Sequence, residues 1–300
     1  MALKRKIAYI DLTSEEIVTK SIPPAVRRKF LGGRGLDAYL IYNHVPKGAD
    51  PLGPENVSVI SAGVLVGTCA SASARTHVGG KSPLTGYFGS SNMGGFFGPE
   101  LRWAGFDHLV IKGRSEKPVY LWIRNGTIEI RDAADLWGLG TLETQERLRA
   151  MHDDEDLQAL VIGPAGEKMV RYANVMTSLK NAGGRSGMGA VLGSKNLKAV
   201  AVRGTMDIEI AHPEEALAYD KQIIDGITRT KLTKIMGTYG TMFIYGVTNS
   251  TGLVRVKNFQ ENQLPDSEGL ECENIEASSI GTSGCFGCQI HCRHRYVIRE

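Results

Sequence analysis

The 300-residue sequence has no strong excess of charge of either sign and no long apolar run. Its 35 basic and 32 acidic residues leave a net charge of +3, which is too small to indicate a nucleic-acid partner. Each strand-like apolar stretch is interrupted by glycine or a charged residue, so none is long enough to cross a bilayer. The first residues, MALKRKIAYIDLT, contain no apolar signal core followed by a cleavage site. We therefore expect a cytoplasmic protein with neither a nucleic-acid nor a membrane partner.

Cysteine is also scarce. The five cysteines are Cys69, Cys272, Cys285, Cys288 and Cys292. An odd number, with three crowded into eight positions, is not typical of a disulfide framework. Crowded thiols in a cytosolic chain are more often metal ligands, whereas the isolated Cys69 is expected to be a small core residue.

Glycine, in contrast, is abundant: 36 of 300 residues, against a usual share of about 7%. The excess is concentrated in three clusters, Gly32–Gly35, Gly94–Gly98 and Gly183–Gly193. Tight turns account for part of it. Because glycine tolerates positive φ and lets the backbone approach a ligand closely, the clusters also indicate loops around a cofactor.

Alternating apolar residues and turn signals predict that the first two thirds of the chain are rich in β-strands. Lys6–Leu12 and Glu16–Ser21 form one expected hairpin, and Asn125-Gly126 is the strongest turn signal of a second hairpin. Two helices are expected in this part of the chain, one after Pro23-Pro24 and one over Thr141–Met151. The other expected strands are Val57–Val66, His108–Lys112, Pro118–Ile123, Thr127–Arg131, Leu157–Ile162 and Leu197–Val202.

The pattern changes after Ile208. Pro213-Glu214-Glu215 predicts the start of a helix that runs towards Thr228, and few strand-like runs follow. No repeat or low-complexity segment is visible. We therefore expect an α+β protein with a β-rich cofactor-binding domain over residues 1–208 and the start of a mainly helical domain over residues 209–300.

The segment Cys285-Phe-Gly-Cys288-Gln-Ile-His-Cys292 is a C-x2-C-x3-C array. Thiolates at this spacing can converge on one centre. A [4Fe–4S] cluster uses four ligands, commonly from irregular cysteine runs of this kind. A tetrahedral zinc site is the competing interpretation, with Cys272, His291 or His294 as a fourth ligand. The spacing alone does not decide between iron–sulfur and zinc.

Three segments carry backbone donors and polar side chains suited to an anionic cofactor. The first, Ser73–Thr76, contains Arg75, whose planar fork of donors suits a phosphate or the edge of a heterocycle. The second, Ser90–Leu101, is predicted to be a loop that enters a short helix, where free N–H groups suit an anion. The third is the glycine-rich Asn181–Gly193. Three such segments in one domain favour a ligand site over turns alone.

Together these segments resemble the aldehyde:ferredoxin oxidoreductase family of tungsten and molybdenum bis-pterin enzymes, specifically its amino-terminal half. The resemblance covers the whole chain and ends with the C-x2-C-x3-C array. The motifs that carry it are GGRGL at Gly32–Leu36, PENVSVISAGVLVGT at Pro54–Thr68, KSPLTG at Lys81–Gly86, GGFFGPELRWAGFD at Gly94–Asp107, IGPAGE at Ile162–Glu167, GMGAVLGSKNLKAVAVRG at Gly187–Gly204 and GLVRVKNFQ at Gly252–Gln260.

The resemblance implies an amino-terminal domain of two β-sheets that form a saddle for a tungsten or molybdenum bis-pterin, with a [4Fe–4S] cluster close by and a magnesium ion bridging the pterin phosphates. Arg75 would lie between the pterin and the cluster. The other implied cofactor contacts are Asn92, Gly94, Gly95, Ala182, Gly183 and Arg185, and the implied cluster ligands are Cys285, Cys288 and Cys292.

The activity implied by the resemblance is the oxidation of a small aldehyde to a carboxylic acid, with electrons passed through the cluster to ferredoxin or another carrier. A homo-oligomer or a heteromeric complex is expected for the intact enzyme. His77, His108 and Glu100 are expected to be ordinary hydrogen-bonded polar residues, so no catalytic acid or base is assigned.

Two departures from the family pattern stand out. Asn181 replaces an arginine that family members often carry before the alanine of the third segment. Family members are also considerably longer, so the fourth cluster cysteine, the substrate pocket and the acid/base residues are expected beyond Glu300. The alternatives are a catalytic subunit similar to tungsten-dependent benzoyl-CoA reductase, or an inactive metal-binding fragment.

Overall fold

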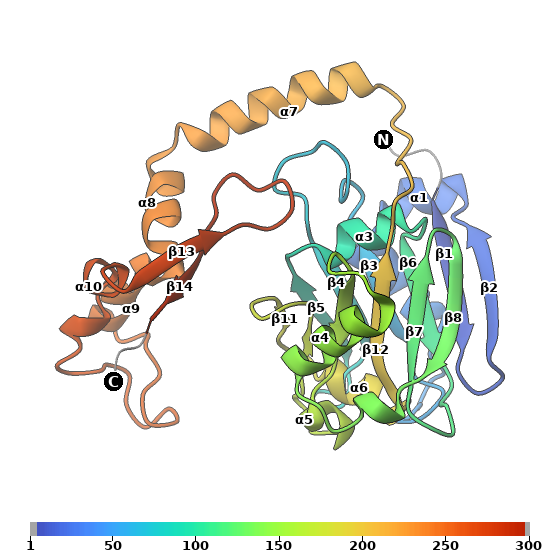
Figure 1. Cartoon of the computed structure of the whole chain (residues 1–300). Coiled ribbons are helices and arrows are strands. Elements are labelled where there is room, and N and C mark those ends of the chain that lie inside the picture. The colour runs from blue at the N-terminus through green and yellow to red at the C-terminus, as the bar shows by residue number, and fades with distance from the viewer. Residues whose placement is uncertain (1–4, 298–300) are drawn as a thin grey trace. The chain divides into compact units, whose positions relative to one another are not determined.

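The computed structural model describes residues 5–297 and divides the chain into two compact units, Met1–Pro213 and Glu214–Glu300 (Figure 1). Residues 1–4 and 298–300 of the two predicted domains lie outside the described residues. The first unit contains two six-stranded sheets, and the second contains mostly helices with one small hairpin. The predicted α+β class with a pair of sheets is therefore confirmed.

The first sheet has the strand order β2-β1-β6-β3-β4-β5. β1 forms the predicted amino-terminal hairpin with β2, and β6 lies parallel to β1. All other neighbouring strands of this sheet are antiparallel. The strands are β1 (Lys6–Asp11), β2 (Glu16–Ser21), β3 (Ser58–Ala62), β4 (Thr76–Lys81), β5 (Phe88–Met93) and β6 (His108–Lys112).

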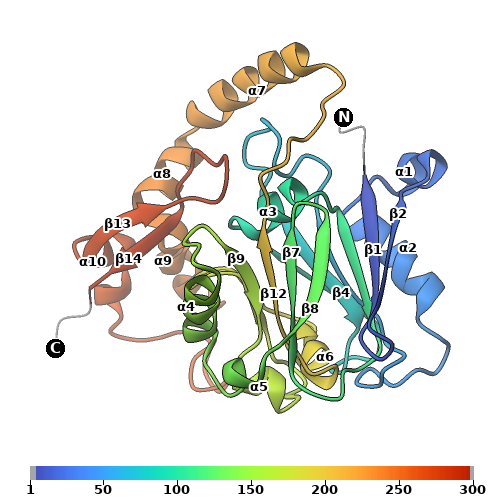
Figure 2. The same ribbon diagram turned by 45° about the vertical axis from the view of Figure 1, so that its right-hand side comes forward.

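The second sheet has the order β11-β10-β9-β12-β7-β8 (Figure 2). The hairpin of β7 and β8 turns at Asn125 and Gly126, which have φ values of 43° and 90°. Positive φ at both turn residues is what an Asn-Gly hairpin turn requires, so this prediction is confirmed. The strands are β7 (Val119–Arg124), β8 (Thr127–Asp132), β9 (Gln158–Val161), β10 (Val175–Met176), β11 (Ala182–Gly183) and β12 (Leu197–Arg203).

The two sheets repeat one connectivity. Adding six to each strand number of the first sheet gives β8-β7-β12-β9-β10-β11, which is the order of the second sheet. In both sheets the first strand pairs with the sixth in parallel, and the sixth pairs with the third in antiparallel. A helix follows the fifth strand in both, α3 (Phe97–Trp103) and α6 (Met188–Ser194). The first unit is therefore an internal structural duplication, although no repeat is visible in the sequence.

Buried apolar side chains form a central core and two outer ones. The central core joins inward-facing residues of both sheets, such as Ile60 and Val200, to Leu101 of α3 and Val191 of α6. An outer core lies between the first sheet and the helix α2 (Arg34–His44), and another between the second sheet and α4 (Thr141–His152). The remaining helices of this unit are α1 (Pro24–Phe30), α5 (Pro164–Glu167) and the 3-10 turn η1 (Ala134–Leu136).

The second unit begins in the long helix α7 (Pro213–Thr228), as the sequence predicts. In agreement with the few strand runs expected here, the described strands of this unit form one antiparallel hairpin on either side of the cysteine array, β13 (Ser279–Ser283) with β14 (Arg293–Tyr296). The other elements are α8 (Lys231–Tyr239), η2 (Gly240–Ile244), α9 (Tyr245–Ser250), η3 (Glu268–Leu270) and α10 (Cys272–Glu276).

Three local predictions need correction. The strand expected over Val57–Val66 ends at Ala62, because the chain turns at Gly63, whose carbonyl accepts from Val66 N–H. The glycine cluster at residues 32–35 is not wholly a loop, since α2 begins at Arg34. Ser90–Met93, expected to be a loop, completes strand β5. In this last case pairing with β4 overrides the local signal.

Candidate functional site

The predicted cofactor residues of the first unit lie along the terminal strands of the two sheets. Asn92 is in β5, and Gly94 and Gly95 connect β5 to α3. Ala182 and Gly183 form β11. β5 and β11 are each the last strand of their own sheet and lie against each other. The duplicated fold thus places two equivalent strand–loop–helix connections side by side.

Serine side chains join these two connections. Ser91 Oγ donates to Arg185 O at 2.8 Å and accepts from Arg185 N–H at 3.1 Å. Ser90 N–H donates to Ser186 Oγ at 3.0 Å. These three hydrogen bonds join two residues of β5 to two residues of the segment after β11, so the second and third predicted segments form one continuous edge of the first unit.

Arg75 lies directly before β4, at the same edge. In the β4–β5 register Thr76 is opposite Met93, so Arg75 lies at the strand end next to Gly94. Its side chain is exposed, as are those of Asn92 and Arg185. The backbone carbonyl of Arg75 accepts from Gly63 N–H at 3.2 Å, which fixes the main chain while leaving the guanidinium available for a ligand.

The glycines of this edge differ in the space around them. Gly95 has φ +104°, and a Cβ there would overlap the side-chain amide of Asn181. A Cβ on Gly183 would lie 2.6 Å from Val175 Cγ2 and 2.9 Å from Met93 Cε. A Cβ on Gly184, in contrast, would meet nothing within 4 Å. The backbone at residue 184 is therefore open to a ligand. Together with the exposed donors of Arg75, Asn92 and Arg185, this open backbone fits an anionic pterin.

The cysteine array lies in the connection between β13 and β14 of the second unit, not on a helix. Cys285, Cys288 and Cys292 are free thiols of intermediate exposure. Cys288 N–H donates to Cys285 O at 3.1 Å, and Gly287 and His291 have positive φ, so the segment bends back on itself. The Arg293 guanidinium donates to Gly284 O across the base of the segment.

The chemistry of this donor set fits an iron–sulfur cluster, because three thiols of one turn can all become thiolates. Within residues 5–297, however, no group of three or more His, Cys, Asp or Glu side chains is already placed to hold a metal ion. The assignment of Cys285, Cys288 and Cys292 as ligands therefore stays a prediction.

A buried polar network joins α2 to strands of the first sheet, and Asp37 of α2 at its centre is not singled out by any sequence motif. Asp37 Oδ1 accepts from His108 Nδ1 at 2.7 Å, and its Oδ2 accepts from His77 Nδ1 and from Ser61 Oγ. His77 Nε2 lies 2.9 Å from Ser90 Oγ. The available signal was a carboxylate between Leu36 and Leu40 on the apolar face of a helix, which has to be paired once buried.

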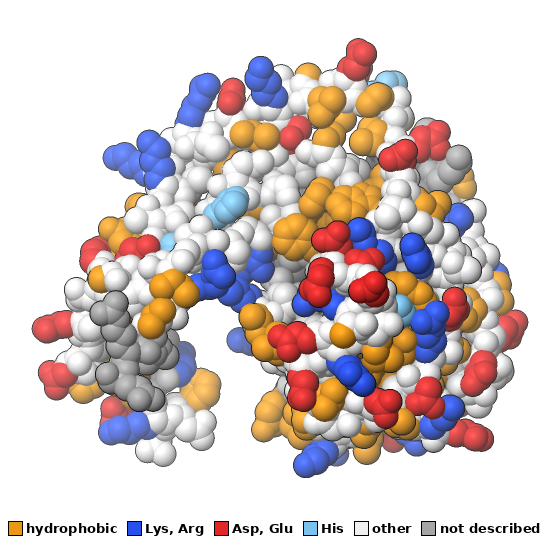
Figure 3. Space-filling model, in the orientation of Figure 1, with side chains coloured by type: hydrophobic (Ala, Val, Ile, Leu, Met, Phe, Trp, Pro, Cys, Tyr) orange, Lys and Arg blue, Asp and Glu red, His pale blue; other side chains and the backbone are white. Residues whose placement is uncertain are grey.

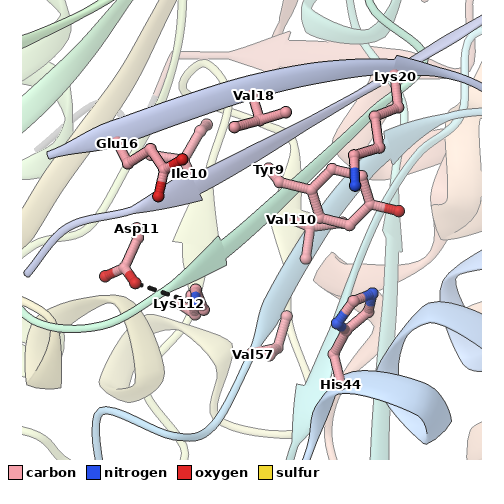
Figure 4. A pocket seen from close by; sticks show the side chains of 10 residues that line it. All are labelled: Tyr9, Ile10, Asp11, Glu16, Val18, Lys20, His44, Val57, Val110 and Lys112. Atoms are coloured by element: carbon pink, nitrogen blue, oxygen red, sulfur yellow. Dashed lines mark ion pairs between the residues drawn. The ribbon is translucent and has the colours of Figure 1, made fainter. Parts of the chain in front are cut away.

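A depression lies elsewhere, on the face of β1, β2 and β6 (Figure 4). Its volume is about 280 Å³, and Asp11 and Lys112 form an ion pair of 3.0 Å in it. Lys20 lies 5.4 Å from the centre of the Tyr9 ring. Burial, then Lys112 and Lys20, lower the pKa of His44. None of the predicted cofactor residues lines this depression, and its two acids balance its two lysines, so no ligand class is indicated.

The described part of the chain contains no helix long and apolar enough to cross a membrane. On the face shown in Figure 3, acidic and basic side chains are interspersed, in agreement with the small net charge.

Two glycine-rich strand ends joined in one unit, followed by a thiol-bearing turn in the next, are features that a cofactor-binding oxidoreductase of the predicted class requires. Family comparisons agree with this class. The model of the aldehyde ferredoxin oxidoreductase N-terminal domain matches residues 7–204, and the model of domains 2 and 3 of the same enzymes matches residues 218–300. The chain belongs to the aldehyde ferredoxin oxidoreductase family.

Individual relatives support the assignment. The chain is 39% identical to the tungsten-containing aldehyde ferredoxin oxidoreductase of Pyrococcus furiosus over 94% of its own length and 47% of the relative's. It is 38% identical to the enzyme of the same description from Thermococcus kodakarensis, with the same coverage. It is 33% identical to the WOR-like subunit of an aliphatic sulfonate oxidoreductase of Pyrococcus furiosus, covering 97% of this chain and 49% of that protein. The chain thus spans about half the length of the curated relatives it matches.

Among solved structures, the fold is similar to the active-site complex BamBC of benzoyl coenzyme A reductase bound to 1,5-dienoyl-CoA. The TM-score is 0.86 and the sequences are 31% identical. The match covers 99% of this chain and 48% of the other chain.

Proposed function

We propose that the protein oxidises an aldehyde to a carboxylic acid at a tungsten or molybdenum bis-pterin centre, and that electrons leave through a [4Fe–4S] cluster to ferredoxin. The observation that carries the proposal is that the connection after the fifth strand of the first sheet is repeated after the fifth strand of the second sheet. Two equivalent strand–loop–helix connections, β5 to α3 and β11 to α6, lie side by side and offer two equivalent places for two pterins.

In this proposal the residues of the edge bind and orient the cofactor. Asn92, Gly94 and Gly95 would hold its polar edge and phosphates from the first connection, and a magnesium ion would supply positive charge to those phosphates. Ala182, Gly183 and Arg185 do so from the second connection. When bound, the metal centre supplies the two-electron oxidation chemistry, and the protein supplies position and electrostatics.

Electron exit is proposed to depend on Arg75 and the cysteine array. Arg75 is exposed at the strand end beside Gly94, and its guanidinium offers a planar fork of donors to a cofactor bound there. Cys285, Cys288 and Cys292 are the proposed cluster ligands, which makes residues 209–300 the cluster-bearing part and residues 1–208 the pterin-binding domain.

A second candidate is a reductase acting on an aromatic coenzyme A thioester. The structural similarity to the BamBC complex, with a TM-score of 0.86, specifically favours it. That complex also makes a heteromeric assembly an alternative to a homo-oligomer for this protein.

The test is to purify the protein anaerobically and measure tungsten, molybdenum, pterin, iron and zinc in the same sample. We expect one tungsten or molybdenum with two pterins and about four irons. Dye reduction driven by aldehydes, compared with that driven by a dienoyl-CoA, separates the two candidates. Zinc at one per chain with neither pterin nor iron would contradict both.

A further inference from the structure

The buried network of Asp37 connects four strands of the first sheet in one row. In the pairing registers, His108 of β6 is opposite Ser61 of β3, and Ser61 is opposite His77 of β4. His77 in turn is opposite Asn92 of β5. Directly opposed residues of neighbouring strands share a face of the sheet, so the row runs from the buried interior to the edge that carries the proposed cofactor contacts.

Asp37 fixes the orientation of both imidazole rings. Burial alone would raise its pKa, but His108 and then His77 hold the pKa below its usual value, so it is a carboxylate that only accepts hydrogen bonds. The Nδ1 atoms of both rings therefore carry hydrogens and donate to it. His77 Nε2, on the opposite side of the ring, lies within hydrogen-bond distance of Ser90 Oγ, at 2.9 Å.

The buried network of Asp37 meets the candidate site at Ser90, a residue of β5 two positions before Asn92. The side chain of Ser90 contacts His77, while its backbone N–H donates to Ser186 Oγ at 3.0 Å and its backbone carbonyl accepts from the same hydroxyl at 3.3 Å. Ser90 therefore bonds at once to the buried network and to the segment that follows β11. β5 is the last strand of its sheet and pairs with β4 only, so these bonds of Ser90 add to the β4–β5 pairing in holding its position.

A glycine in β4, Gly79, leaves room for the contact between His77 and Ser90. Gly79 is opposite Ser90 in the register. A Cβ on Gly79 would lie 3.0 Å from His77 Cε1 and 3.1 Å from Ile41 Cδ1. A side chain at residue 79 would therefore press on the imidazole that reaches Ser90.

We propose that His77 is a positioning residue for the cofactor edge: held by Asp37, it fixes Ser90 and thereby keeps β5, with Asn92, in place for the pterin. The inference rests on the proposed function for the role of Asn92. His77 itself does not touch the cofactor in this arrangement; it acts through Ser90.

The experiment compares variants in the full natural protein, isolated with its cofactor. His77→Asn keeps an amide donor near Asp37 but cannot reach Ser90, and Ser90→Ala removes the hydroxyl without touching the buried acid. Ser90→Thr keeps the hydroxyl. His108→Asn is the matched control, because it alters the other imidazole that donates to Asp37. Unlike Nε2 of His77, Nε2 of His108 has no hydrogen-bond partner among residues 5–297.

The measurements are hydrogen exchange of the β5 amides and the fraction of pterin retained after gel filtration. We expect exchange in β5 to become about fivefold to tenfold faster in His77→Asn and Ser90→Ala, with less pterin retained, and no further change in the double variant. Ser90→Thr and His108→Asn should match the unsubstituted protein in β5.

Equal acceleration by His77→Asn and His108→Asn, or unchanged exchange in Ser90→Ala, would overturn the inference. If the unsubstituted protein holds no pterin, the proposed function fails instead, and the exchange rates still decide whether His77 holds β5.

Discussion

Asn181 occupies the space that a side chain at residue 95 would need, since a Cβ on Gly95 would overlap the Asn181 amide. Asn181 is buried in the short turn between β10 and β11, where its Nδ2 donates to Ser178 Oγ at 2.9 Å. The loop after β5 and the turn before β11 are therefore fitted to each other across the two sheets.

This fit predicts that Gly95→Ala destabilises the first unit. Alanine at φ +104° is strained, and its methyl group must also displace Asn181, so we expect the free energy of unfolding to fall by more than about 1 kcal/mol. Gly184→Ala is the control, because its Cβ would meet nothing within 4 Å. Urea unfolding of both variants measures the difference, and equal midpoints would show that the glycine is not required.

A second prediction concerns the buried Lys195. Its Nζ donates to Asn56 O at 2.6 Å and to Gly113 O at 3.1 Å, and no carboxylate is paired with it among the described residues. Burial, and then Arg114, lower its pKa from 10.5 to about 7, although Asp11 opposes this. The two carbonyls favour the charged form and so oppose part of this shift.

The sign of the pH dependence follows from this lowered pKa. Between pH 7 and 10.5 the unfolded chain binds more protons at Lys195 than the folded one, so stability rises with pH in this window. The slope from one group is at most about 1.4 kcal/mol per pH unit. Lys195→Met should flatten the rise, and Lys47→Met, at an exposed position, should not. Chemical unfolding at pH 7, 8, 9 and 10 provides the measurement; parallel curves for Lys195→Met and the unsubstituted protein would refute it.

The third prediction is that Cys288→Ala removes most of the iron and the broad absorption of the cluster. It takes one thiolate from the middle of the bent segment, and a cluster that loses one of its ligands becomes open to solvent. Cys69→Ala, in the other unit, should keep its iron. Iron analysis after anaerobic purification gives the result, and the reverse pattern would mean that the ligands are misassigned.

The fourth prediction separates the shape of Arg75 from its charge. Arg75→Lys keeps a cation but loses the planar fork, so we expect retained pterin and slower electron delivery to the acceptor. Arg75→Ala should also retain less pterin. Arg28→Ala, at an exposed position of α1, is the control and should change neither quantity. Pterin content and single-turnover reduction of the cluster are the measurements; normal electron transfer in both Arg75 variants would contradict the proposed role.

Much of the fold was predictable from short-range signals. The hairpin at Asn125-Gly126, the helix after Pro23-Pro24 and the strand at His108–Lys112 all lie where the sequence predicts them. The order of glycine-rich segments, followed by the cysteine array, was enough to indicate the family. These features depend on turn geometry, proline and side-chain period within a few residues, which the sequence displays directly.

Only the tertiary structure determined what the separate segments do together. The duplicated sheets share a strand order without any visible sequence repeat, because many different apolar residues can fill the same buried positions. Ser91 meets Arg185, and Asp37 meets both His77 and His108, through contacts between residues far apart in the chain. Such pairings are selected by burial and by strand register over the whole unit, and no local pattern of residues encodes them.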